Sequence, residues 1–228
     1  MSEARQPGPD LRHIDTWLFD LDNTLYPIES EVMTLVSGRM TDFMQRVTGL
    51  PRDEARAIQK RYYHEHGTTL AGLLANDHGI DPEDFLTAVH DVSLDALSPD
   101  PALTAGLERL PGRRLVFTNG SATHAERVLD RLGIAHVFED IFHIAAAGYI
   151  PKPSPVTFGM MIARHGVTAS GSAFFEDSEH NLAPAAALGM TTVLVGAHAA
   201  ESTASFVHHR ARHLAGFLNA IRVKEIHA

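Results

Sequence analysis

The sequence contains no cysteine, which excludes disulfide bonds, thiolate metal sites and cysteine nucleophiles together. It also has no apolar run of the length that a membrane-spanning helix needs, so no membrane partner is expected. Basic residues are fewer than acidic ones, 19 against 28, and the formal net charge is −9. Because affinity for nucleic acid depends mainly on clustered lysine and arginine, this balance argues against a nucleic-acid-binding protein. A small anionic substrate remains compatible if its site is locally positive.

The composition is typical of an ordinary globular protein, with 44% hydrophobic and 21% charged residues. A length of 228 residues favours one domain, or one core with a modest insertion. The polar residues 1–13 lack the apolar centre of a signal peptide, so we expect a flexible N-terminal tail and a cytoplasmic protein. Of the 15 histidines, neither His64/His66 nor His208/His209 has a recurring metal-ligand spacing, which favours solvated surface residues.

Apolar runs bounded by turn residues predict five short strands, at residues 16–19, 115–118, 141–144, 173–176 and 192–195. Helical patterns between the later strands each end near a glycine, and this alternation predicts a parallel sheet covered on both faces. We therefore expect an α/β fold whose core, residues 14–26 and 99–228, is a Rossmann-like doubly wound parallel sheet. The last segment, residues 208–221, is expected to be an amphipathic helix.

Residues 27–98 interrupt the alternation because they contain several helical patterns and no convincing strand. Such an insertion directly after the first strand is expected to form a helical cap over one end of the sheet. A cap must open for substrate and close against water, so hinges are expected near Tyr26-Pro27 and Ser98-Pro99.

Polar side chains follow three of the predicted strands. In chain order they are Asp20 with Asp22, Thr118 with Asn119, and Glu176 with Asp177. The carboxyl ends of strands in an open α/β sheet line the edge that binds ligands. If the crossovers are right-handed, the first and fourth strands adjoin, and Asp20 and Asp177 become neighbours. Taken singly, each group has an alternative interpretation as a helix or turn cap.

Lys152 lies between two prolines, which restrict the backbone and hold one cation in a fixed place. A solvated loop lysine is the alternative interpretation. Like charges about 4 Å apart repel by roughly 4 kcal/mol at an effective dielectric near 20, so paired carboxylates beside a phosphate need a cation. A hard divalent ion with oxygen ligands, supported by Lys152, relieves that repulsion, and Mg²⁺ fits the all-oxygen ligand set best.

Together and in this order, the four segments resemble the motifs of the haloacid dehalogenase-like (HAD) superfamily, specifically its phosphatases with a helical cap after the first strand. The resemblance covers residues 15 to about 196. It implies that Asp20 is the nucleophile, and that Asp22 first protonates the leaving group and then activates water. Asp22 also separates this chain from true haloacid dehalogenases, whose pattern lacks the second acid.

The same resemblance assigns the other polar groups. Phosphoryl oxygens would be held by Thr118, the N–H of Asn119 and Lys152, and Mg²⁺ by Asp20, Asp177 and the backbone carbonyl of Asp22. The last motif departs from the usual pattern at Glu176 and Asn181. This departure makes Glu176 a further candidate for the metal shell.

A narrower resemblance lies in the cap, where residues 62–73, together with residues 20–27, look like pyrimidine 5′-nucleotidases of this superfamily. It implies a nucleoside 5′-monophosphate such as UMP or CMP as the substrate. The base would be held by cap residues, for which the candidates are Tyr63, His66, Thr68 and Thr69. Packing among the cap helices is the alternative for each of them.

The leading hypothesis is therefore hydrolysis of a phosphomonoester by a Mg²⁺-dependent enzyme through an aspartyl-phosphate. The alternatives among enzymes are a phosphatase of phosphoglycolate or a sugar phosphate, and a phosphomutase whose cap shields the intermediate from water. A non-catalytic phosphometabolite-binding module is disfavoured because every expected reactive group is present. The sequence leaves the oligomeric state open.

Overall fold

The computed structural model describes residues 8–225, and its strands there form a six-stranded, wholly parallel sheet. Along the chain the strands are β1 Thr16–Phe19, β2 Arg113–Phe117, β3 Asp140–Phe142, β4 Ser172–Glu176, β5 Thr191–Val195 and β6 His209–Ala211. Their order in the sheet is β3-β2-β1-β4-β5-β6. The chain therefore winds outward in both directions from β1, which confirms the predicted doubly wound α/β fold.

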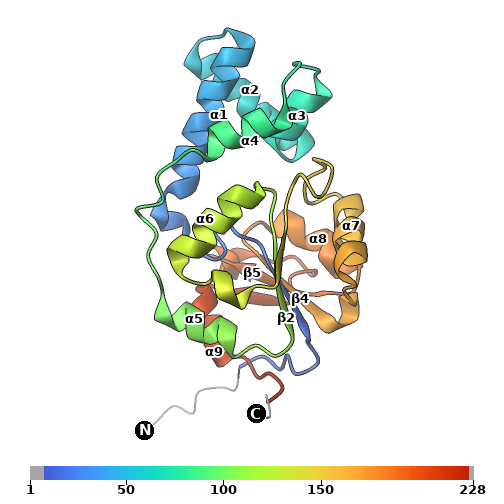
Figure 1. The fold of residues 1–228 in the computed structure, drawn as a ribbon. Coiled ribbons are helices and arrows are strands. Elements are labelled where there is room, and N and C mark those ends of the chain that lie inside the picture. The colour runs from blue at the N-terminus through green and yellow to red at the C-terminus, as the bar shows by residue number, and fades with distance from the viewer. Residues whose placement is uncertain (1–7, 226–228) are drawn as a thin grey trace.

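Helices cover both faces of the sheet (Figure 1). They are α5 Pro101–Glu108, α6 Ala122–Leu132, α7 Pro155–His165, α8 Glu179–Ala187 and α9 Leu214–Ala220. Successive strand residues point to opposite faces. Thus Phe19 and Phe175 pack in one hydrophobic cluster with α5, α6 and α9, whereas Leu18 and Phe174 pack in another with α7 and α8. This burial of both faces explains why the strands read as unbroken apolar runs.

Four helices lie together beyond one end of the sheet, at the top of Figure 1. They are α1 Val32–Thr48, α2 Arg52–His66, α3 Thr69–Ala75 and α4 Pro82–His90. They share a hydrophobic cluster that includes Phe43, Leu73 and Phe85 and to which Ile144 of the core also belongs. The Thr68 hydroxyl accepts the Ala71 N–H at the start of α3, as an N-cap does.

The connection from α4 back to the core runs along α6. Arg127 donates to the backbone carbonyls of His90 and Val92, and Arg131 donates to that of Leu94. Val92, Leu94 and Leu97 are buried in the cluster shared with β1 and α6. Residues 92–97 therefore pack against the core, and the extent of the cap to residue 98 stays a prediction. A connection without strand periodicity or a helical pattern gives no sign of such packing.

Two other expectations are corrected at the opposite end of the sheet. Leu11 is 1% exposed, and its N–H donates to the carbonyl of Arg222. The prediction of a flexible tail is therefore wrong for the residues next to the core. The apolar side chain of Leu11 belongs to the hydrophobic cluster of the core and holds this segment in place. Residues 1–7 lie outside the described part. The predicted closing helix is also too long, since His209–Ala211 pairs with β5 as an edge strand and only Leu214–Ala220 is helical.

Candidate active site

The ammonium group of Lys152 lies at the centre of the polar residues that follow the strands. Its side chain is 1% exposed. Nζ donates to Asp20 Oδ1 at 2.8 Å, to Glu176 Oε2 at 2.7 Å and to the carbonyl of Phe117 at 2.7 Å. Burial lowers the pKa of Lys152, but the charges of Asp20 and Glu176 outweigh it and raise that pKa to about 12. The lysine is therefore a cation with all three protons in hydrogen bonds.

Three carboxylates meet at the ends of β1 and β4, which are neighbours in the sheet. Asp20, Glu176 and Asp177 each place an oxygen within 4.8 Å of the others. Burial raises the pKa of Asp20 to about 7 and that of Glu176 to about 7, and the charge of Lys152 opposes both shifts. Burial and the charge of Asp20 raise the pKa of Asp177 to about 6.

This cluster can hold a metal ion. Among residues 8–225, the three acids of this cluster have one cationic partner, Lys152, so the site favours additional positive charge. Hard divalent cations take such carboxylate oxygens as ligands, so the residues present fit Mg²⁺. The Asn23 side chain donates to Asp177 Oδ2 at 3.3 Å and orients that acid toward the others.

The backbone around Asn119 is tied to the lysine loop. The Asn119 amide oxygen accepts the Lys152 N–H at 2.8 Å, and its amide nitrogen donates to the Lys152 carbonyl at 3.2 Å. Thr118 is buried and its hydroxyl accepts the Gly120 N–H at 2.9 Å. These bonds bring the ends of β2 and the Lys152 loop together, so the predicted phosphate-binding residues border one cavity.

Asp22 is held by a residue that the sequence analysis missed. His124, on the buried face of α6, places Nε2 2.8 Å from Asp22 Oδ1, and the Tyr26 hydroxyl donates to the same oxygen. Burial raises the pKa of Asp22, but these hydrogen bonds outweigh it and bring that pKa below its usual value. The available signal was a histidine on the apolar face of a helix that starts at a strand end.

A cavity of about 1050 Å³ lies between the strand ends and the cap. All the predicted core residues line it, as do the cap candidates Tyr63, His66, Thr68 and Thr69. The cap candidates differ in how accessible they are to a ligand, since Tyr63 is 56% exposed whereas Thr69 is 3% exposed. The hydroxyl of Thr68 is already used in capping α3. Tyr63 and His66 are therefore the freer candidates for contact with a ligand.

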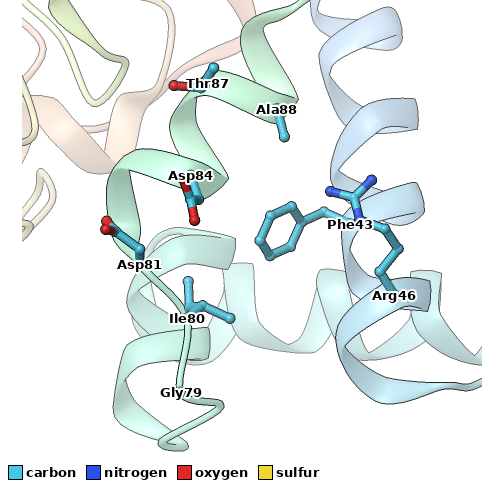
Figure 2. Close-up of a pocket in the computed structure, with 8 residues that line it drawn as sticks. All are labelled: Phe43, Arg46, Gly79, Ile80, Asp81, Asp84, Thr87 and Ala88. Atoms are coloured by element: carbon cyan, nitrogen blue, oxygen red, sulfur yellow. The ribbon is translucent and has the colours of Figure 1, made fainter.

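A second hollow, of about 530 Å³, lies within the cap between α1 and α4 (Figure 2). Phe43 and Arg46 of α1 border it, with the Arg46 guanidinium 4.8 Å from the centre of the Phe43 ring. Its other lining residues follow α3 or belong to α4. It includes none of the polar residues at the strand ends, so it is separate from the candidate active site.

Residues 14–189 match the family model of the haloacid dehalogenase-like hydrolases. Since this match spans most of the sequence, the chain belongs to the haloacid dehalogenase-like hydrolase family. The resemblance stated from the strand-end motifs is thus confirmed at the level of the family.

Two curated relatives share part of the sequence. Phosphate metabolism protein 8 of Saccharomyces cerevisiae is 31% identical over 204 residues, which cover 82% of this chain and 63% of that protein. Fructose-1-phosphate phosphatase YqaB of Escherichia coli is 33% identical over 110 residues, which cover 46% of this chain and 56% of that protein. The chain thus spans less than two thirds of the length of either relative.

Solved structures of the family share the fold. A HAD phosphatase from Thermococcus onnurineus superposes with a TM-score of 0.61 at 21% identity, covering 92% of this chain and 100% of its own. L-2-haloacid dehalogenase from Xanthobacter autotrophicus has a TM-score of 0.55 at 15% identity, and the match covers 90% of this chain and 97% of that one. In the part of the chain that the structure describes, no helix is long and apolar enough to cross a membrane.

Proposed function

We propose that this protein is a Mg²⁺-dependent phosphomonoesterase that works through an aspartyl-phosphate on Asp20. The observation that carries the proposal is the arrangement at the end of β1. Asp20 is oriented by the Lys152 ammonium beside two further acids, and a second carboxylate, Asp22, follows two residues later. The names of the two relatives, phosphate metabolism protein 8 and fructose-1-phosphate phosphatase, also support phosphate chemistry.

In the first step, a carboxylate oxygen of Asp20 attacks phosphorus while the bond from phosphorus to the ester oxygen breaks. The leaving oxygen takes a proton from Asp22. A bound phosphate adds negative charge beside Asp22, and this charge favours the protonated form that the step requires. Lys152, Thr118 and the Asn119 N–H would bind the phosphoryl oxygens and stabilise their developing charge.

In the second step, water attacks the phosphorus of the aspartyl-phosphate and gives a proton to Asp22. The bond from phosphorus to the Asp20 oxygen breaks, which releases inorganic phosphate and restores both carboxyl groups. Mg²⁺, held by Asp20, Asp177 and the Asp22 backbone carbonyl, would neutralise negative charge around the phosphoryl group. Glu176 has one oxygen on Lys152 and the other on the Ser178 N–H, which favours a role in orienting the lysine over direct metal binding.

For the substrate we propose a pyrimidine nucleoside 5′-monophosphate. The cavity extends from the phosphate-binding residues to Tyr63 and His66 of α2, which leaves room for a sugar and a base beyond the phosphate. A sugar phosphate is the second candidate, which the name of the E. coli relative favours. A phosphomutase stays an alternative, and a cytoplasmic location stays a prediction.

The proposed function is tested by phosphate release with Mg²⁺ and with EDTA across UMP, CMP, dUMP, AMP, GMP, phosphoglycolate and sugar phosphates. We expect Mg²⁺-dependent release with a preference for UMP and CMP. Preference for another phosphate would remove the nucleotide assignment and keep the core chemistry. Isomerised sugar phosphate in place of free phosphate would identify a mutase, and no reaction with any substrate would contradict the enzyme proposal.

A further inference from the structure

The Asp22 carboxylate has two oxygens in different surroundings. Oδ1 is bonded to both Tyr26 and His124, whereas Oδ2 accepts no protein hydrogen bond within residues 8–225. Asp22 lines the active-site cavity, and a Cβ added to Gly120 would lie 3.7 Å from Oδ2. A side chain at position 120 would therefore contact Oδ2 and would also lie close to the Thr118 hydroxyl, at 3.2 Å.

The His124 ring is itself tightly placed. Its side chain is fully buried, and its Nδ1 has no hydrogen-bond partner in the described part of the chain. An ionised carboxylate only accepts hydrogen bonds, so Nε2 is the nitrogen that donates to Asp22. A proton on Nδ1 would be buried without a partner, which disfavours that tautomer. The ring therefore presents its donor to Asp22 alone.

A histidine of the cap packs against this ring. His90, the last residue of α4, stacks on His124 with ring centres 4.3 Å apart and planes 11° apart. Its Nδ1 lies 3.0 Å from the Ser121 hydroxyl, and Arg127 donates to its carbonyl at 2.8 Å. His90 is thus bonded to the N-cap residue and to the middle of α6, and it lines the cavity while it stacks on one face of His124.

We propose that Tyr26 and His124 are positioning residues that hold Oδ1 of Asp22, so that Oδ2 is the oxygen that exchanges protons with the leaving group and with water. The inference rests on the proposed function. Neither residue needs to touch the substrate. The terminal torsion of an aspartate has a broad energy minimum, so without these donors the carboxylate rotates more freely. Oδ2 then faces the leaving group or the attacking water less often. His90 extends the same support to the cap, because its ring stacks on that of His124.

The two reaction steps depend on Asp22 differently when the leaving group is p-nitrophenolate. This anion leaves without a proton, so the first step needs no acid, whereas activation of water in the second step still needs Asp22 as a base. Loss of the positioning bonds therefore slows the second step alone. The aspartyl-phosphate then accumulates, and p-nitrophenolate appears in a burst followed by a slow steady state.

The experiment is stopped-flow hydrolysis of p-nitrophenyl phosphate with Mg²⁺ by wild type, H124L, H124Q and the exposed-histidine control H136L. We expect H124L to lower kcat about 10- to 100-fold, with a burst near one equivalent per enzyme. H124Q, whose amide nitrogen replaces Nε2 as a donor, should recover most of kcat and lose the burst. H136L should match wild type. A wild-type rate in H124L, a fall without a burst, or no recovery in H124Q would overturn the proposal.

Circular dichroism and thermal unfolding show whether H124L folds. If H124L does not fold, the variant Y26F tests the proposal instead. It removes the hydroxyl that donates to Asp22 Oδ1 and keeps the aromatic ring at position 26. We expect Y26F to slow the second phase about 3- to 10-fold, and an unchanged second phase would overturn the proposal. Wild-type turnover tests the phosphatase proposal separately, since the positioning inference is judged from ratios between variants and an active wild type.

Discussion

The two ends of the active-site cavity are built differently. At the strand ends the polar side chains are buried and connected, as Lys152 shows with three hydrogen bonds and 1% exposure. At the cap end, Tyr63 is 56% exposed. The side-chain contact of His66 is a long one to an exposed acid, with Nε2 3.9 Å from Oε2 of Glu65. Rigid groups suit a reaction that depends on geometry, whereas freer groups suit recognition of a variable part of the substrate. The difference predicts that changes at the two ends affect different quantities.

The largest effect is expected for Asp20→Asn, which replaces the nucleophilic carboxylate by an amide. Turnover should fall on the order of 10⁴-fold or more, while the fold stays intact because the two side chains have similar shapes. Phosphate release and circular dichroism check both statements. Asp53→Asn, an exposed change at the start of α2, is the matched control and should leave turnover unchanged. More than a tenth of the wild-type rate in Asp20→Asn would exclude this nucleophile.

Lys152→Met should destabilise the core and make its stability more dependent on pH. Removing one partner of a buried ion pair costs about 3 kcal/mol. Asp20 and Glu176 have folded pKa values raised to about 7, so their contribution to stability is present below their unfolded pKa values and is lost as the pH rises through 7. Without the ammonium these pKa values rise further, so the loss should be larger at pH 8 than at pH 5.

Urea unfolding with EDTA at pH 5, 6.5 and 8 measures this change. Lys60→Met is the control, because Lys60 is an exposed cap residue on the same cavity. It should leave the free energy of unfolding within about 0.5 kcal/mol of wild type. An equal loss for Lys152→Met at pH 5 and pH 8 would contradict the assigned role of the two acids.

A smaller effect is expected for Mg²⁺ on thermal stability. At 100 times its Kd the ion should stabilise the folded state by about 2.7 kcal/mol, which corresponds to about 5 to 10 °C for a chain of this size. Asp177→Asn should remove most of that shift, while the metal-free variant should be at least as stable as wild type at pH 7.5 because one buried negative charge is gone. Equal Mg²⁺ shifts in the two proteins would remove Asp177 from the metal site.

The smallest effect is expected in the cap, for Tyr63→Ala. Loss of one aromatic contact should raise KM for the preferred nucleotide about 3- to 10-fold and leave kcat within about twofold. Tyr63→Phe, which keeps the ring, should stay near wild type. Steady-state kinetics separate the two constants. A fall in kcat at unchanged KM would place Tyr63 with the reacting groups instead and would break the distinction between the two ends.

Much of the arrangement was predictable because it depends on local patterns. Apolar runs, each followed at once by a polar group, located β1, β2 and β4, and the right-handed crossover rule predicted that Asp20 lies next to Asp177. The family followed from the same motifs. The roles of the individual site residues stay predictions for the experiments above.

Other features had no local signal. Leu11 and β6 are held by pairing with distant segments, and a three-residue edge strand leaves no periodic pattern to detect. Glu176 stays a candidate metal ligand because it belongs to the acidic cluster, but its ion pair with Lys152, 24 residues earlier in the chain, was not predicted. The identity of a partner for a buried charge depends on which side chains the fold brings near it.

The sequence by itself determined five of the six strands, the adjacency of β1 and β4, and the strand ends that carry the acids, because apolar runs and turn residues act between near neighbours. The tertiary structure alone supplied the second donor to Asp22, beside the nearby Tyr26. Its donor His124 is 102 residues away, and His90, which packs on that donor, comes from the cap. Such contacts arise because burial leaves each polar atom only the partners that packing supplies, and no local pattern encodes that choice.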